Sequence, residues 1–401
     1  MEQKRSISRR TVLLMAITCG FTVSNVYLNQ NLLLSMAETF RISSTEIGIV
    51  ATLSQVGYAI GNLTLVPLGD LFERRKMILS LLMFVCLSLV ASALSPNFIW
   101  LIMANLFLGF FTIVPQIIVP LAASFSIDKE RGKVLGNVAI GLVCGILGAR
   151  FISGVVNNYL GWRSMYWISF GCTLVIILLI KMHLPKSKGI QSMKYGELLQ
   201  SLWPLFLREK ILRRACVSQA MMFGAFSLFW TTLVFRLSHS PFHYSSSVAG
   251  TIGLVGIGGA FATPIIGRII DHKGATFANI LCMLLGFISF MLFTIGNTSL
   301  IAIVIGSLFI TMGTQANQVA CQAQIFLLPE EIRSRLNGIY MVSTFLGGAL
   351  GSYLGTLAWS HYKWGGVCFV GLIMIIVAFT SAFGLKKKIN TEAKVSQRRG
   401  Q

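Results

Sequence analysis

Arg150 draws attention first, because it is a permanent cation inside an apolar run that covers residues 134–157. A charge at membrane depth is costly and usually faces a partner, a water-filled cavity or a ligand. No Asp or Glu falls inside any apolar segment of the chain. Arg150 must therefore meet carbonyl groups, amides, water or an anion. Two interpretations stay open: a substrate anchor or gate, and a structural arginine bonded to polar side chains such as Asn25 or Gln30.

Uncharged polar side chains supply the other candidates for ligand binding. Amide and phenol groups can orient a ligand inside a mostly apolar pocket. Besides Arg150, the candidates for a substrate cavity are Asn25, Gln30, Gln55, Tyr58, Gln116, Gln315 and Asn317. The alternative for each is an ordinary hydrogen bond between helices, which contributes about 0.6–2 kcal/mol.

The sequence lacks the patterns of an enzyme or a metal protein. It contains no G-x-x-x-x-G-K-[ST] loop for nucleotide phosphates and no H-E-x-x-H or clustered Cys and His ligands. The eight cysteines lie in apolar segments without a C-x-x-C pair, so we interpret them as small buried hydrophobic side chains. We expect no catalysis, no cofactor and no metal.

The elements that position these residues are membrane helices. Only 11% of the residues are charged, against about 25% in soluble proteins. Residues 77–127 and 276–329 contain no charged side chain, and a spanning helix needs about 20 apolar residues. The runs lack the alternation of a membrane barrel. We predict an all-α membrane protein.

Twelve apolar segments indicate twelve spanning helices. They cover approximately residues 12–35, 47–68, 77–95, 98–124, 134–157, 163–183, 214–237, 247–267, 276–295, 299–326, 337–360 and 365–385. The first run is too long for the apolar part of a signal peptide and is followed by no small-residue cleavage site, so we expect it to be retained.

The net charge of +20 is concentrated at segment ends. Lys and Arg are enriched in cytoplasmic loops of membrane proteins, and the alternate loops that contain them here place both termini in the cytoplasm. We therefore interpret the positive charge as a signal of orientation in the membrane. We expect the chain to be surrounded by membrane lipid and to bind no nucleic acid.

The longest polar stretch divides the chain into two halves. We predict an N-terminal six-helix bundle at 1–184, a cytoplasmic linker at 185–212, a C-terminal six-helix bundle at 213–388 and a cytoplasmic tail at 389–401. Repeated halves are typical of secondary transporters.

An internal repeat supports this division. Asp70 and Asp271 follow corresponding helices and lie 201 residues apart. Small residues with one-turn spacing recur at an offset of 202: Gly145 and Ala149 in one half, Gly347 and Gly351 in the other. Such spacing lets another helix approach closely.

The segment P-L-G-D-L-F-E-R-R-K at 67–76 resembles the signature loop G-x-x-x-D-R-x-G-R-R/K of the major facilitator superfamily. Asp70, Arg74 and Arg75 match the loop, whereas Val66, Leu71 and Glu73 replace its Gly, Arg and Gly. The second half contains a related G-R-I-I-D-H-K-G at 267–274. Fragments at 114–123, 148–154, 161–167 and 333–341 resemble the drug-efflux-like bacterial branch, although the Gly-Pro typical of the fifth helix is replaced by Gly148-Ala149.

This resemblance implies a fold of two pseudo-symmetric six-helix bundles and a cytoplasmic gate. The gate residues that it implies are Asp70, Arg74, Arg75, Asp128 and Asp271, with Arg74 pairing with Asp128 when the inside is closed. The alternative is a solvated charged loop that only sets the orientation in the membrane.

The resemblance further implies a monomeric secondary transporter in the bacterial cytoplasmic membrane. The first expectation is export of a drug-like or amphipathic small molecule, with proton coupling suggested by the family alone because no titratable group lies centrally. The second is uptake or exchange of a small organic anion, which Arg150 would anchor. A receptor or scaffold with a vestigial transport fold is a third interpretation.

Overall fold

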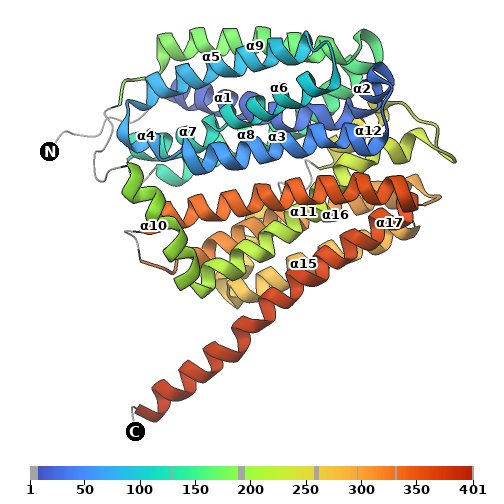
Figure 1. The fold of residues 1–401 in the computed structure, drawn as a ribbon. Helices are drawn as coiled ribbons and strands as arrows, with labels where there is room; N and C mark the ends of the chain where they lie inside the picture. The colour runs from blue at the N-terminus through green and yellow to red at the C-terminus, as the bar shows by residue number, and fades with distance from the viewer. Residues whose placement is uncertain are drawn as a thin grey trace.

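The computed structural model describes residues 8–127, 130–187, 195–256, 262–295, 297–329 and 332–399. The described residues form helices joined by short turns, and none of them lies in a β-strand. Figure 1 shows two layers of helices, one from each half of the chain, with their long axes roughly aligned.

The first half contains nine α-helices and one short 3-10 helix. In chain order they are α1 (Arg9–Tyr27), η1 (Leu28–Asn31), α2 (Leu33–Phe40), α3 (Ser44–Thr64), α4 (Leu68–Leu71), α5 (Arg74–Ala93), α6 (Phe98–Phe111), α7 (Val114–Phe125), α8 (Arg131–Leu160) and α9 (Trp162–His183). Pro115 lies in the first turn of α7, which begins at Val114 after α6 has ended at Phe111, so the segment predicted at 98–124 is two helices instead of one.

The second half contains the remaining helices. They are α10 (Tyr195–Arg208), α11 (Lys210–Ser238), α12 (Ser246–Val255), α14 (Ala262–Lys273), α15 (Ala275–Ile295), α16 (Leu300–Ile325) and α17 (Arg333–Arg399). Helix α10 lies within the segment that we predicted as a linker. Helix α17 has a non-helical backbone at Lys363, with φ 51° and ψ −145°, so it comprises two helices joined at a kink.

The described helices account for twelve membrane crossings. Nine stretches are long and apolar enough to span a bilayer, and one of these, Arg335–Ser381, contains the kink and crosses twice. Helix α3, which contains polar side chains such as Gln55 and Asn62, and the shorter helices α12 and α14 complete the set. This confirms the predicted all-α membrane fold with two six-helix bundles.

Side chains of the sequence start several helices in the expected way. Asn97 accepts a hydrogen bond from the Trp100 amide at 2.9 Å and caps α6. Ser43 and Glu46 form a reciprocal capping box at the start of α3, with the Ser43 amide donating to the Glu46 carboxylate at 2.8 Å. Both caps satisfy amide groups that have no partner inside the helix.

Small residues bring equivalent helix pairs into backbone contact in the two halves. A Cβ atom added to Gly145 of α8 would meet the backbone of Gly20 in α1. In the other half, a Cβ atom added to Gly351 of α17 would meet the backbone of Gly224 in α11. Ala149 is buried on α8, and Gly347 contacts the backbone of Ala220. The two pairs have the close approach that glycine permits.

The halves meet along two helix pairs, α3 with α17 and α8 with α12. A Cβ atom added to Gly154 would lie 2.6 Å from the Ser246 carbonyl oxygen, and one added to Gly250 would lie 2.8 Å from that of Arg150. These contacts lie in the part of the bundle that is remote from α10. The opposite end, which we call the α10 end, carries α4, α10 and the starts of α5 and α8 (Figure 1).

Candidate functional site

Arg150 lies between the halves and is completely buried. Its Nε and Nη2 atoms donate hydrogen bonds to the Gln30 side-chain oxygen at 3.1 and 3.0 Å. The Asn31 amide donates to the Arg150 carbonyl at 2.7 Å, which fixes the backbone of α8 against η1. Gln30 is thus one of the two amide partners that the sequence suggested. Asn25, the other one, is buried in α1.

Three aromatic rings surround the Arg150 guanidinium. The guanidinium carbon lies 4.3 Å from the ring centre of Trp230 and 5.2 Å from those of Tyr27 and Phe226. Tyr27 comes from α1, whereas Phe226 and Trp230 come from α11 in the other half. Such contacts stabilise a desolvated cation by about 2 kcal/mol or more at the best positions. The arginine cluster, which we define as Tyr27, Gln30, Arg150, Phe226 and Trp230, therefore joins the two halves.

The arginine cluster has more hydrogen-bond donors than acceptors. Arg150 Nη1, Gln30 Nε2 and Trp230 Nε1 are buried and find no hydrogen-bond partner within the described part of the chain. No Asp or Glu is buried among the described residues. Buried donors nearly always have a partner, so an exception needs an explanation. A carboxylate, phosphate or other electron-rich group of a ligand would satisfy several of these donors at once.

A second set of polar side chains, the glutamine cluster, crosses the same interface. Gln55 of α3 donates to Ser352 Oγ of α17 at 2.8 Å, and it accepts from Ser227 of α11 at 3.2 Å. Thr231 and Ser352 share a further hydrogen bond of 3.0 Å. All four side chains are buried. The glutamine cluster thus links one helix of the first half to two helices of the second.

Tyr58 and Gln116 lie close to this interface from the first half. The Gln116 amide donates to the Tyr58 hydroxyl at 3.4 Å, and the Tyr58 ring lies 4.1 Å from the ring of Phe345 in α17. Gln116 is half-buried, and so is Gln315 on α16. The Tyr58 ring thus adds a further contact between α3 and α17.

Asn317 belongs to a separate polar cluster inside the second half. Its amide donates to Gln219 at 2.7 Å and to Ser218 at 3.3 Å, and its oxygen accepts from Asn279. The partners come from α11 and α15, which flank α16. The structure therefore does not bring Asn317 together with Arg150.

The predicted gate residues lie at the α10 end, and only some have described side chains. Arg74 donates to the Gly69 carbonyl at 3.1 Å, and Arg75 donates to the carbonyl of Lys181. Asp271 is exposed at the end of α14. The side chain of Asp70 and the whole of Asp128 lie outside the described residues, so the pairing of Arg74 with Asp128 stays a prediction.

Phe226, Ser227 and Ser352 were not predicted from the sequence, although they contact the predicted site residues Arg150 and Gln55. Serines and phenylalanines are common in membrane helices, so their type carries no signal of depth or partner. The spacing of Phe226 and Trp230, one helical turn apart in α11, is consistent with a shared face but also with simple packing.

No group of three or more His, Cys, Asp or Glu side chains occurs among the residues that the structure describes. The arrangement is instead suited to reversible binding, because a fixed cation, amides and aromatic rings from both halves converge on one place.

Comparisons with known proteins give a consistent result. A family model of the Major Facilitator Superfamily matches residues 12–327. The uncharacterized transporter YgaY of Escherichia coli O157:H7 is 35% identical over 375 residues, covering 92% of this chain and 94% of its own. The probable transporter SCO4007 of Streptomyces coelicolor is 30% identical over 369 residues, covering 92% and 86%.

Solved structures share the architecture. A bacterial homolog of the human lysosomal transporter Spinster, in an inward-facing and occupied conformation, matches with a TM-score of 0.74 at 13% identity, covering 94% of this chain and 96% of its own. A POT family transporter in complex with 5-aminolevulinic acid matches with a TM-score of 0.75 at 13% identity, covering 93% and 95%. At such identities the likeness concerns the fold alone.

Proposed function

The chain belongs to the major facilitator superfamily, and we propose that it carries a small organic molecule across the cytoplasmic membrane by alternating access. It is a multi-pass membrane transporter of the secondary type. In this proposal the halves rock about the arginine and glutamine clusters, which open and close as the site faces each side in turn. Transporters of this kind keep their substrate site near the middle of the membrane, between related halves.

We propose that the structure is closed at the end remote from α10. The glycine contacts of α8 with α12 lie on that side, and Gly253 of α12 covers the stem of Arg150, since an added Cβ would lie 3.1 Å from the Arg150 Cβ. Opening this end requires the rings of α11 to leave Arg150 and the Gln55–Ser352 hydrogen bond to break.

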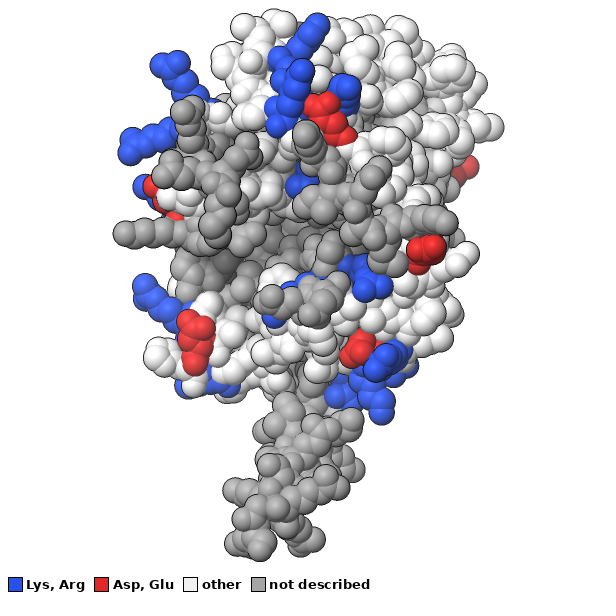
Figure 2. Space-filling view, turned by 90° about the vertical axis from the view of Figure 1, so that its left-hand side faces the viewer, with Lys and Arg blue, Asp and Glu red and all other residues white. Residues whose placement is uncertain are grey.

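The proposed orientation places the α10 end in the cytoplasm. Figure 2 views this end and shows Lys and Arg side chains of both halves around its rim. Cations such as Arg75, Lys133 and Lys210 begin membrane helices there, as expected for cytoplasmic loops. Both termini would then be cytoplasmic.

Export of an amphipathic or drug-like compound is our first proposal for the substrate. The observation that carries it is the mixture of aromatic rings and amide groups at the interface between the halves, which suits a molecule with an apolar body and few polar groups. The direction comes from the resemblance to efflux transporters. Proton coupling likewise comes from the resemblance, and the part of the chain that the structure describes offers no buried carboxylate as proton carrier.

Transport of a small organic anion is the second proposal, because one specific observation favours it. Arg150, Gln30 and Trp230 each have a buried donor without a hydrogen-bond partner in the described part of the chain, and Arg150 has no acidic partner there. Arginine is well suited to bind carboxylate or phosphate in a forked geometry.

One experiment separates the two proposals. The purified chain in proteoliposomes is supplied with lipophilic cations or with carboxylate and phosphate anions, with and without an imposed pH gradient. Movement of cations that follows the gradient and persists in Arg150→Ala supports export. Saturable movement of anions that is lost in Arg150→Ala and indifferent to pH supports the second proposal. Absence of any saturable flux would remove both.

A further inference from the structure

A large pocket lies on the outside of the first half, away from the substrate interface. It has a volume of about 940 Å³ and is lined by residues of α1, α8 and α9. Most of its lining is apolar, including Leu13, Ile17 and Phe21 of α1 and Ile140 and Ile152 of α8. These side chains are 40–62% exposed although they belong to membrane-spanning helices.

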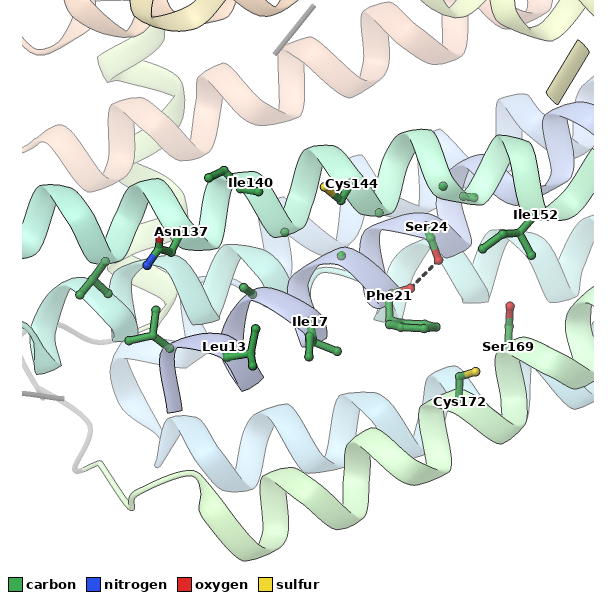
Figure 3. Close-up of a pocket in the computed structure, with 18 of the residues that line it drawn as sticks. Leu13, Ile17, Phe21, Ser24, Asn137, Ile140, Cys144, Ile152, Ser169 and Cys172 are labelled. Atoms are coloured by element: carbon green, nitrogen blue, oxygen red, sulfur yellow. Dashed lines mark hydrogen bonds between the residues drawn. The ribbon is translucent and has the colours of Figure 1, made fainter. Parts of the chain in front are cut away.

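Figure 3 shows how the pocket is bounded. Phe21 of α1 and Ile152 of α8 point toward Ser169 and Cys172 of α9 across an open space. Small residues keep the wall along α8 shallow, since a Cβ atom added to Gly148 would meet nothing within 4 Å. The pocket therefore exists because α9 stands off from α8 where α8 has no side chain to fill the space.

The position of α9 is set by another neighbour. Helix α9 packs more extensively against α5 than against α8, and Arg75 at the start of α5 donates to the carbonyl of Lys181 in the last turn of α9. This bond holds the α10 end of α9 on the side of α5. The opening beside α8 is thus part of the packing arrangement, and it faces the hydrocarbon of the membrane.

The two ends of the pocket differ in charge. Arg9 and Lys133 line it at the α10 end, together with Glu130. Arg10 and Lys181 are exposed at the same end. Two cations and one carboxylate thus line this end of the pocket, whereas its other lining residues are uncharged. The pattern of an apolar slot with a cationic mouth at the membrane surface matches the chemistry of an anionic lipid.

We propose that this pocket holds an acyl chain of an anionic phospholipid, whose phosphate lies against Arg9 and Lys133. Apolar walls inside a bilayer cannot be left to water, and an acyl chain is the hydrocarbon that the surroundings supply. Bound there, the lipid occupies the outer side of α8, one helix diameter from Arg150 on the inner side. The lipid therefore sits where it can resist or assist the movement of α8 between states.

The test uses the full chain in nanodiscs of phosphatidylcholine, doped with photoactivatable lipids that carry a diazirine in the acyl chain. One probe has a phosphatidylglycerol headgroup and the other a phosphatidylcholine headgroup, and labelled peptides are identified by mass spectrometry. We expect the phosphatidylglycerol probe to label α8 and α9 residues of the pocket in preference to other lipid-facing positions. The phosphatidylcholine probe should label them more weakly.

Matched variants define the two parts of the site. Gly148→Phe fills the pocket and should abolish its labelling, while Gly171→Phe, on the exposed side of α9 where an added Cβ also meets nothing, should not. The pair Arg9→Gln and Lys133→Gln should reduce the preference for phosphatidylglycerol by about fivefold for each cation removed. The exposed cations Lys186 and Lys210 serve as controls when changed to Gln.

Three results would overturn the proposal. Equal labelling along all lipid-facing helices would mean annular lipid only. Equal labelling by both headgroups, unchanged in the Arg9 and Lys133 variants, would remove the anionic headgroup from the site. Loss of labelling on addition of a transported amphipathic compound would make the pocket part of the substrate's route instead of a lipid site.

Discussion

The inner face of α8 carries Arg150, whereas its outer face carries Gly145, Gly148 and Ile152. On the inner face a cation is enclosed by rings and an amide from both halves of the molecule. On the outer face small and aliphatic residues border an apolar pocket that opens toward lipid. One helix thus presents a polar site to the protein and an apolar site to the membrane without a change in its backbone.

The two faces also differ in what a substitution should do. The inner face is completely buried and its partners belong to the other half, so a change there alters the coupling between halves. The outer face has space, so a change there should be absorbed without disturbing the fold. The variants below test whether the inner and outer faces of α8 act independently.

The largest effect is expected from Arg150→Ala. The change removes the cation that Trp230 and Gln30 contact from the two halves, and it leaves the Gln30 oxygen buried without its donors. Losing one member of a buried, hydrogen-bonded charge contact costs about 2–5 kcal/mol, so transport of an organic anion that Arg150 anchors should fall at least about thirtyfold. Initial rates in proteoliposomes measure the effect.

Arg163→Ala is the matched control. Arg163 also lies over a tryptophan, 4.2 Å from the ring centre of Trp162, and donates to the Ser95 carbonyl at 2.9 Å, but all these partners belong to the first half. Its loss should leave transport within about twofold, as for most sites outside a special contact. An equal loss in both variants would show that arginine–ring contacts stabilise the fold in general and that the inner face of α8 is not special.

Gln55→Leu should have a smaller effect on the balance between the two states. The change removes hydrogen bonds to Ser352 and from Ser227 across the halves. Bonds of this kind in membrane proteins contribute about 0.6–2 kcal/mol. The population of the state closed away from α10 should fall about three- to thirtyfold, as measured by distances between spin labels on the ends of α3 and α17.

Asn62→Leu controls for the loss of an amide from the same helix. The Asn62 amide donates to the Tyr58 carbonyl, also within α3, at 2.8 Å. It joins no residue of the other half through that bond, so the spin-label distances should stay unchanged. A double variant of Gln55→Leu with Ser352→Ala should change the spin-label distances no further than Gln55→Leu alone, because the Gln55–Ser352 contact is already lost and the remaining Ser352 bond to Thr231 lies within the second half.

The outer face of α8 predicts a difference in thiol reactivity. Cys144 lies on the pocket wall and is exposed, whereas Cys19 on α1 is fully buried. An apolar maleimide in the membrane should label Cys144 and spare Cys19. Gly148→Phe, one turn away, should slow the labelling of Cys144 several-fold while transport changes by less than about twofold. A parallel loss of transport would show that the two faces of α8 act as one functional unit.

The fold was accessible from the sequence because lipid imposes a simple rule. Long runs without charge must be helices, and the offset near 202 between the halves revealed the two bundles. The positions at which helices are interrupted could not be predicted from the sequence. Pro115 divides a predicted span, α10 forms inside the predicted linker, and Lys363 kinks α17. Hydropathy reports the length of an apolar run but not the point at which a chain bends to pack.

The sequence predicted the candidate site only through residues whose placement inside a membrane costs free energy. Arg150 stood out because a charge inside a membrane needs a partner, and Gln30 followed as a neighbouring amide. Ser227, Ser352 and Phe226 did not stand out, since uncharged residues incur little cost at any depth. Their roles depend on pairing across more than seventy residues, which no local pattern encodes. The outer pocket is a space that the packing of α1, α8 and α9 leaves unfilled, and no sequence pattern predicts such a space.

The smallest predicted effect concerns a group remote from both faces of α8. The Ser43 hydroxyl and amide donate to the Glu46 carboxylate, which lowers the pKa of Glu46 below its usual value of 4.5. Because the folded-state pKa is the lower one, this cap contributes stability above the usual value and loses that contribution as the pH falls through the folded value. Thermal unfolding of the purified chain below about pH 5 should therefore be less sensitive to acid in Glu46→Gln than in the original chain. The same acid range should leave labelling of Cys144 unchanged, because Glu130, the carboxylate that lines the pocket, lies about four helical turns away at its α10 end. If acid released the protection of Cys19 as well, the α3 cap and the packing of α1 on α8 would form one cooperative unit, and the two faces of α8 could not be perturbed separately.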